Sequence, residues 1–297
     1  MVASKFNKRS TAEEVTEGLD LSGKTVLITG VNSGIGTETM RVMALRGAHV
    51  IGTARTLEKA SHAAAGVAGT VTPLACELTD QDDIRRCAVA VAETTPVIDI
   101  VIANAGIMAL PKLEQVDGIE KQFATNHLGH FLLVNLLKDQ ITAAENARIV
   151  VVSSSAHLQA PKEGIQFDNL SGEHGYSAFR AYGQSKLANV LFANGLNQRL
   201  GDGVTANSLH PGVIRTNLAR HMNPVLTGVM GLFMVAFSKS IAQGAATQCY
   251  VATSADLAGT AGKYFADCHE ARTHRLAGDR HLADRLWKVS EELVGLA

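Results

Sequence analysis

The sequence predicts a single α/β domain built on a doubly wound parallel sheet of about seven strands, with helices on both faces. Three observations favour this class. Short runs of β-branched and apolar residues alternate with helix-like stretches, and the spacers are long enough for crossover helices. The early runs are almost continuously apolar, which is typical of strands covered on both faces.

Seven segments carry the strand pattern, and the first five are the most continuously apolar. A parallel sheet of this kind binds its ligands beyond the carboxyl ends of its strands. Functional residues are therefore expected directly after the segments. The predicted strands span residues 25–29, 49–54, 71–76, 98–104, 148–154, 204–210 and, more weakly, 262–266.

The N-terminal residues and the net charge argue against a secreted protein and against a nucleic-acid-binding protein. Residues 1–20 are polar, lack the apolar region of a secretory signal, and predict an N-terminal extension that is ordered only if it docks. No linker-like change in composition follows, so residues 21–297 are expected to form one domain. A net charge of −1 without a long basic block argues against nucleic acid as a partner.

Cysteine spacing and hydropathy favour a cytoplasmic protein. Four cysteines match no zinc pattern and are expected to be reduced thiols. The longest apolar run, 225–237, is too short to span a bilayer, so no transmembrane segment is expected. The cysteines are Cys76, Cys87, Cys249 and Cys268.

A glycine-rich turn, "TGVNSGIG", follows the first predicted strand at residues 29–36. Gly30, Gly34 and Gly36 lie where a strand must turn sharply into a helix, and glycine permits positive φ and close backbone approach. The N–H groups at the start of that helix suit a pyrophosphate. The spacing is G-x-x-x-G-x-G, and turn geometry alone would also explain it.

The end of the second predicted strand bears on cofactor choice. An acidic residue there accepts a hydrogen bond from the ribose 2′-OH of NAD, whereas arginine accommodates the 2′-phosphate of NADP. Here Ala54 and Arg55 end the segment, and the first acid is Glu58. The pattern favours NADP(H), with NAD(H) still possible, and the alternative is that Arg55 is a surface charge.

Tyr182 and Lys186, in "AYGQSKLANVLF", lie four residues apart on a predicted helix and therefore share one face. A free phenol has a pKa of ~10, and a nearby ammonium lowers it. A decrease to ~7 corresponds to about 4 kcal/mol. Tyr182 could then exchange a proton with a carbonyl or alcohol oxygen. Taken alone, the pair could also be an amphipathic surface pair.

Several motifs together resemble the short-chain dehydrogenase/reductase family. The resemblance covers most of residues 24–216 and implies a single-domain Rossmann fold, so that 21–297 would be one dinucleotide-binding catalytic domain. The matching motifs are "TGVNSGIG", "ANAG" at 103–106, "TNHLGHF" around Asn126, "VVSSS", "YGQSK" and "HPGVIRT" at 210–216.

Within that family the chain looks most like the retinol dehydrogenase branch and its WW-domain oxidoreductase relatives. The stretch between the serine and tyrosine motifs is long, as is usual in this branch. Further similarity extends almost to the C-terminus, in "FDNLSGE", "GKYFADC" and "LWKVSEEL".

The resemblance implies a role for each of four catalytic residues. Tyr182 would be the general acid/base, and Lys186 would support it and bond the nicotinamide ribose. Ser154 would bond the substrate oxygen, with Ser155 the second choice and Ser153 also open. Asn126 would hold a water that links Lys186 to solvent.

The resemblance also implies a set of cofactor contacts. Val213 and Thr216 should meet the nicotinamide carboxamide. Glu77 stands where the family often has an aspartate next to the adenine, which puts that contact in doubt. The implied cofactor-binding residues are Gly30, Asn32, Ser33, Gly34, Ile35, Gly36, Arg55, Glu77, Leu78, Asn104, Ala105, Gly106, Tyr182, Lys186, Pro211, Gly212, Val213 and Thr216.

No metal is expected. His269 and His274 are five residues apart and would splay on a helix. His127 and His130 are three apart, but they flank Asn126 within a family motif.

The sequence therefore predicts an NADP(H)-dependent oxidoreductase acting on a lipophilic carbonyl or alcohol. A substrate flap is expected at about 217–240, where the apolar residues could form a substrate lid, an oligomer or core contact, or a membrane-surface contact. A homo-oligomer is possible. The alternatives are a catalytically idle NADP(H) sensor on the same fold and, with less support, an epimerase or dehydratase.

Overall fold

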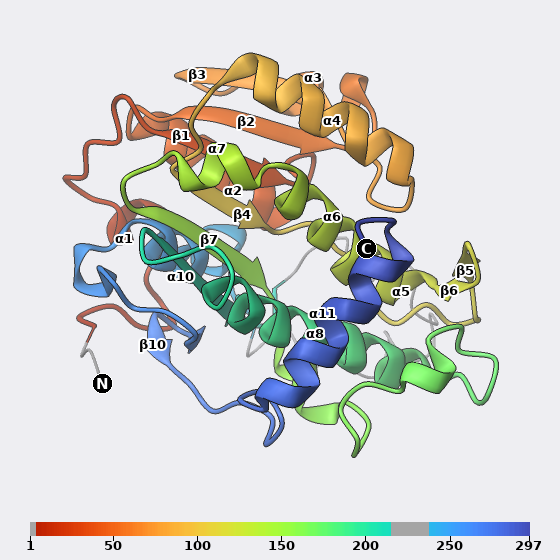
Figure 1. Ribbon diagram of the computed structural model, residues 1–297. Helices are drawn as coiled ribbons and strands as arrows, with labels where there is room; N and C mark the ends of the chain where they lie inside the picture. Colours follow the sequence, from red (N-terminus) through yellow and green to blue (C-terminus); the bar gives the residue numbers. More distant parts are fainter. Residues whose placement is uncertain (1–3, 215–237) are drawn as a thin grey trace.

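The computed structural model describes residues 4–214 and 238–297. Its centre is an eight-stranded sheet with the order β10-β9-β8-β7-β4-β1-β2-β3 (Figure 1). All neighbouring strands pair in parallel except β10, which is antiparallel to β9. The strands are β1 (Thr25–Thr29), β2 (His49–Ala54), β3 (Thr70–Ala75), β4 (Ile100–Ala103), β7 (Ala147–Val152), β8 (Val204–His210), β9 (Tyr264–Ala266) and β10 (His269–Glu270).

The predicted fold class is confirmed, with one strand more in the sheet than the sequence indicated. The additional strand, β10, has only two residues, too few for a periodic signal. A separate hairpin of β5 (Gln115–Val116) and β6 (Ile119–Glu120) was also not predicted.

Strand ends differ from the predictions where the backbone N–H groups bond partners outside the sheet ladder. Residues 98–104 were predicted as one strand, but β4 is shorter. Ile98 N–H donates to Gln140 O, and Asn104 N–H donates to the Thr29 hydroxyl oxygen. β9 begins at Tyr264 rather than at Gly262, which has a φ of +69°.

The sheet separates two hydrophobic cores, and alternate residues of one strand enter different cores. In β1, Leu27 packs with one core, while Val26 and Ile28 pack with the other. This is the arrangement that the continuous apolar runs predicted. The edge strand β3 differs, because its residues are only partly buried.

Helices cover both faces of the sheet (Figure 1). On one face lie α4 (Gln81–Thr94), α6 (Gly129–Leu136), α8 (Ala178–Asn197) and α11 (Arg280–Leu293). On the other lie α1 (Ala12–Val15), α2 (Gly34–Leu45), α3 (Leu57–Ala64) and α10 (Ile241–Thr253). The remaining helical turns are α5 (Lys121–Phe123), a π-helical turn (Ala124–Leu128), α7 (Lys138–Thr142) and 3₁₀ turns at Ser155–Gln159, Phe167–Asn169 and Ala255–Leu257.

The segment before β1 packs on the body of the protein. Ala12 and Val15 of α1 are buried in the core that α10 also enters. Phe6 meets Tyr250 edge-on, with ring centroids 5.8 Å apart, and Glu13 forms an ion pair with Arg41. Described residues 4–20 therefore pack against the rest of the domain. From the sequence, we expected this extension to be ordered only if it made such contacts.

Residues 215–237 lie outside the described residues, and with them Thr216 and most of the predicted flap at 217–240. Both flanks of this segment are described. Ile214 and Lys239 pair in an isolated parallel bridge, so the two flanks lie side by side.

Candidate active site

Tyr182 and Lys186 lie one turn apart on α8 and are buried, with 5% and 3% of their surfaces exposed. Lys186 Nζ is 5.7 Å from the centroid of the Tyr182 ring, so the two side chains face the same space. Gly183 allows α8 to pack closely on the turn after β7. A Cβ at Gly183 would lie 2.7 Å from the carbonyl oxygen of Ala156. This contact brings the phenol beside the end of β7.

Of the three candidate serines after β7, only Ser154 faces the phenol. Ser153 is buried and donates its hydroxyl proton to the carbonyl of Lys186 at 2.7 Å. Ser155 is exposed. Ser154 lies close enough to Tyr182 to act on the pKa of the phenol, and its Oγ accepts from Ala156 N at 3.2 Å.

Burial dominates the electrostatics of the pair. It raises the pKa of Tyr182 to about 12, against which the hydrogen bond from Ser154 acts in the opposite direction. Burial lowers the pKa of Lys186 to about 7, and its ammonium donates to Val152 O at 3.0 Å. The sequence argument expected the ammonium to lower the phenol pKa. Without a cofactor, removal of both groups from water shifts their pKa values more than their attraction for each other does. Each group is therefore pushed toward its neutral form.

Asn126 lies in the π-helical turn before α6 and is fully buried. Its Oδ1 accepts from Ile107 N at 2.8 Å, and its Nδ2 donates to Ile107 O at 3.0 Å. Nδ2 also donates to Ser185 Oγ at 2.9 Å, next to Lys186. The amide therefore joins the loop after β4 to α8. π-helical turns frequently occur at functional sites.

The glycine turn after β1 forms a backbone cradle. Gly30 has a φ of +75°, and a Cβ there would lie 2.9 Å from Ala105 Cα. A Cβ on Gly36 would overlap the carbonyl oxygen of Gly30. Ser33 precedes α2 without a side-chain capping bond, so the first N–H groups of the helix are not claimed by its hydroxyl. Asn32, Gly34 and Ile35 lie in the same turn.

A second turn, at the end of β4, lies against the first. Asn104 Nδ2 donates to Thr29 O at 2.8 Å. Asn104 Oδ1 is buried and has no hydrogen-bond partner within the described residues. Ala105 touches Gly30, and Gly106 lies between Asn126 and Lys186. A buried acceptor beside a cradle that only glycine permits fits a bound dinucleotide.

The other predicted cofactor residues follow the carboxyl ends of β2, β3 and β8. Arg55 is exposed at the end of β2, and Leu78 is buried. Glu77 Oε1 accepts from both the N–H and the hydroxyl of Thr79, so this carboxylate caps its own turn. Pro211, Gly212 and Val213 follow β8, and the Lys239 side chain lies over Gly212.

Sequence reasoning missed several residues around the cluster. His157 Nδ1 bonds Ser154 O at 2.6 Å, and its ring is 4.6 Å from that of Tyr264. The hydroxyl of Thr29 joins β1 to the turn after β4. His157 and Tyr264 carry no signal of their own in the sequence, whereas Thr29 is the first residue of the "TGVNSGIG" motif and ends a predicted strand.

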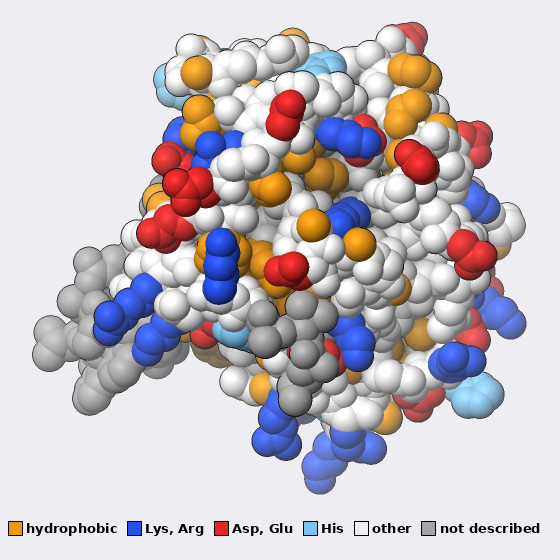
Figure 2. Space-filling model, turned by 90° about the vertical axis from the view of Figure 1, so that its left-hand side faces the viewer, with side chains coloured by type: hydrophobic (Ala, Val, Ile, Leu, Met, Phe, Trp, Pro, Cys, Tyr) orange, Lys and Arg blue, Asp and Glu red, His pale blue; other side chains and the backbone are white. Residues whose placement is uncertain are grey.

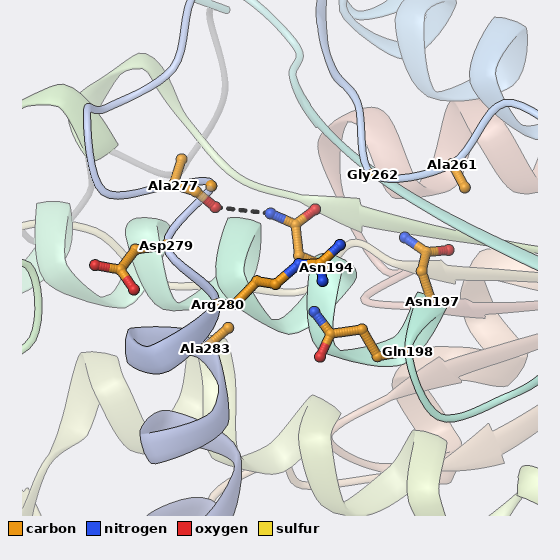
Figure 3. Close-up of a pocket in the computed structure, with 10 residues that line it drawn as sticks. Asn194, Asn197, Gln198, Ala261, Gly262, Ala277, Asp279, Arg280 and Ala283 are labelled. Carbon is orange, nitrogen blue, oxygen red and sulfur yellow. Dashed lines mark hydrogen bonds between the residues drawn. The ribbon is translucent and has the colours of Figure 1, made fainter.

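A cavity of about 330 Å³ lies elsewhere, at the far end of α8. Its walls carry Asn194, Asn197, Gln198 and Arg280, and Asn194 Nδ2 donates to Ala277 O at 2.7 Å (Figure 3). Twelve residues separate Asn194 from Tyr182, about 18 Å along a helix. This cavity is separate from the catalytic cluster.

Neither metal ligands nor membrane spans are found in the part of the chain that the structure describes. No three His, Cys, Asp or Glu side chains among these residues could together hold a metal ion. No described helix combines the length and apolar character needed to cross a bilayer. On the face shown in Figure 2, acidic and basic side chains are interspersed among small apolar patches.

The sequence is similar to several oxidoreductases along nearly its whole length. It is 42% identical to the short-chain dehydrogenase TIC 32 B, chloroplastic, of Brassica napus, over 98% of this chain and 95% of the relative. It is 40% identical to human retinol dehydrogenase 14, over 93% and 88%. It is 38% identical to the WW domain-containing oxidoreductase of Gallus gallus, over 98% and 72%.

Solved structures share the fold. An uncharacterized protein from Mycobacterium paratuberculosis superposes with a TM-score of 0.76 at 33% identity, over 95% of this chain and 97% of that one. The RhlG/NADP active-site complex of Pseudomonas aeruginosa gives a TM-score of 0.63 at 25% identity, over 83% and 95%. The sequence model for short chain dehydrogenases matches residues 24–226. The predicted resemblance is confirmed, and the chain belongs to the short-chain dehydrogenase/reductase family of oxidoreductases, in its retinol dehydrogenase-like branch.

Proposed function

We propose that the protein is an NADP(H)-dependent oxidoreductase that interconverts a lipophilic carbonyl compound and its alcohol, with Tyr182 as the general acid/base. The observation that carries this proposal is the buried cluster of Ser154, Tyr182 and Lys186 beside the glycine cradle. Burial of a phenol and an ammonium costs free energy, so their burial beside the glycine cradle favours a chemical role over a structural one.

Different residues of this chain would bind the dinucleotide, orient the substrate and transfer the proton. The turns at Gly30–Gly36 and Asn104–Gly106 would hold the dinucleotide, which supplies the hydride when bound. Ser154 would orient the substrate oxygen through its hydroxyl, which lies near the phenol. With its pKa raised, Tyr182 is protonated at neutral pH and can donate to a carbonyl oxygen during reduction.

Lys186 and Asn126 would complete a proton path. An ammonium whose pKa is near 7 can give and regain a proton at physiological pH. Ionisation of Tyr182 would in turn stabilise the charged form of Lys186, so the two groups titrate as a coupled pair. The Asn126 side chain is already committed to Ile107 and Ser185. Its backbone carbonyl, with two lone pairs, is the group that could accept from a water.

Four observations support the proposed cofactor and substrate. Arg55 is the charged side chain at the end of β2 that could meet a 2′-phosphate, and one solved relative is described as an NADP complex. Among the exposed large apolar side chains, Leu158, Phe179 and Val213 lie within a few residues of Ser154, Tyr182 and Gly212. Exposed apolar side chains at these positions and relatives named retinol dehydrogenases favour a lipophilic alcohol or carbonyl. The cytoplasmic location stays a prediction.

The test is turnover of NADPH with a panel of apolar aldehydes and ketones, followed at the reduced-nicotinamide absorbance band. Tyr182→Phe should lower kcat about 100-fold or more, because it removes only the acidic hydroxyl. Tyr176→Phe is the matched control, since that phenol donates to Leu110 O outside the cluster. NADPH binding by the wild-type protein without turnover on any member of the panel would instead support an NADP(H) sensor.

A further inference from the structure

The two histidines that flank Asn126 tie its turn to different parts of the fold. His127 Nε2 lies 2.9 Å from Ser290 Oγ on α11. His130 Nε2 lies 2.8 Å from the Thr29 hydroxyl oxygen, and its Nδ1 lies 3.0 Å from the Asn126 carbonyl oxygen. Both imidazoles are at most 1% exposed. Of the two histidines, only His130 therefore bonds a residue of the cofactor-binding turns.

The hydrogen-bonding capacity of Thr29 fixes the proton positions on His130. The Thr29 hydroxyl oxygen accepts the backbone N–H groups of Asn104 and Ala105, each at 3.0 Å, which uses both of its lone pairs. Its single proton is left to donate to His130 Nε2. Nε2 is then unprotonated, and Nδ1 carries the proton that is donated to the Asn126 carbonyl.

These bonds close a ring through the site. From Thr29 the ring passes to the backbone of Asn104 and Ala105, and along the chain to Ile107. Ile107 bonds the Asn126 side chain through both its N–H and its C=O. The Asn126 carbonyl returns the ring to Thr29 through His130. A shift of any member would therefore move Asn126 relative to Ser185 and Lys186.

The ring requires a neutral imidazole. A proton on Nε2 would point at a hydroxyl oxygen whose lone pairs are already used. Burial, followed by the nearby charge of Lys186, lowers the pKa of His130 to about 4, while its bond to Asn126 O acts in the opposite direction. His130 is therefore neutral at pH 7.

We propose that His130, in its neutral Nδ1–H form, is a positioning residue that ties the Asn126 carbonyl to both cofactor-binding turns and keeps it aligned with Lys186. The proposal rests on the proposed oxidoreductase function and adds to it a residue to which the family resemblance assigns no role. The Nδ1–H of His130 takes one lone pair of the Asn126 carbonyl and so holds that oxygen in place.

The experiment compares His130→Phe with His127→Phe, which removes an equally buried imidazole that bonds α11 instead. We would measure kcat and the carbonyl KM with NADPH, and the NADPH Kd by calorimetry. His130→Phe should lower kcat and weaken NADPH binding by about tenfold each, with the carbonyl KM within about twofold of wild type. His127→Phe should lower Tm but leave kcat and the NADPH Kd within about twofold.

A second pair of variants keeps the proposal testable if His130→Phe fails to fold. Thr29→Val removes the hydroxyl that bonds His130, whereas Thr29→Ser keeps it. Thr29→Val should reproduce the losses of His130→Phe, and Thr29→Ser should restore kcat and Kd to within about twofold of wild type. Equal kcat and Kd values for the two histidine variants, or for the two threonine variants, would overturn the proposal. Absence of turnover in the wild-type protein would refute the oxidoreductase function instead, and the NADPH Kd values would still decide the role of His130.

Discussion

The cofactor cradle and the catalytic cluster lie side by side but are built by opposite means. At the turn after β1, the backbone packs closely on itself because Gly30 and Gly36 have no side chains, and backbone atoms lie where Cβ atoms would be. On α8, Tyr182 and Lys186 fill the space themselves, and their burial moves their pKa values in opposite directions. We therefore expect the cradle to respond to steric changes and the cluster to respond to charge and pH.

The largest expected effect comes from removing the buried charge of the cluster. Lys186→Met should raise the free energy of unfolding at pH 6, because burial lowers the pKa of Lys186 from 10.5 to about 7. That decrease is worth up to about 5 kcal/mol, and loss of the bond to Val152 O offsets about 1 kcal/mol. Stability should be measured by urea unfolding at several pH values.

The stability difference between Lys186→Met and the wild-type protein should depend on pH. Between pH 7 and 10.5 the unfolded chain binds the Lys186 proton and the folded protein does not, so wild-type stability rises with pH. The advantage of Lys186→Met should therefore be greatest below pH 7 and should shrink toward pH 10. The exposed Lys288→Met is the control and should show no such trend. An advantage that is constant over this range would mean that burial does not shift the pKa of Lys186.

A steric change tests the cradle. The Cβ of Gly36→Ala would overlap the Gly30 carbonyl oxygen and lie 2.6 Å from Asn104 Nδ2. Overpacking of this kind costs about 1–3 kcal/mol, so NADPH affinity should fall about 10- to 100-fold, as measured by calorimetry. Gly66→Ala is the matched control, because a Cβ at Gly66 meets nothing within 4 Å. Equal Kd values for the two variants would show that the turn can accommodate a Cβ at position 36 without loss of NADPH binding.

The smallest effect is expected at the rim of the cradle, where Arg55 is exposed. Arg55→Asp should lower the ratio of kcat/KM for NADPH to that for NADH by at least about tenfold, since the aspartate repels a 2′-phosphate and can accept from a ribose hydroxyl. Lys59→Asp, on the neighbouring helix α3, controls for the added negative charge. An unchanged ratio would remove Arg55 from cofactor selection.

The parts that the sequence predicted correctly depend on local spacing. Continuous apolar runs marked the central strands, and the four-residue interval placed Tyr182 and Lys186 on one helix face. The glycine spacing marked the turn after β1. Each of these inferences needs only neighbouring residues and the geometry of a helix or strand.

The parts that were missed or reversed depend on tertiary packing. The hydrogen bond from Thr29 to His130 joins residues 101 positions apart, so no local pattern reveals it. The direction in which the pKa of Tyr182 shifts depends on how deeply α8 is buried, which the sequence alone does not reveal. For that reason the sequence argument assigned the largest effect to the neighbouring ammonium, whereas burial is the larger effect in the protein alone.

The central claim is that Tyr182 and Lys186 work as one coupled acid/base unit. It is tested most directly by the pH dependence of kcat/KM for alcohol oxidation with NADP⁺, compared between the wild-type protein and the residual activity of Lys186→Met. The account predicts that the midpoint of the rising limb moves upward by at least about one pH unit in Lys186→Met, because the phenolate loses its stabilising cation. The same midpoint in both proteins would contradict it.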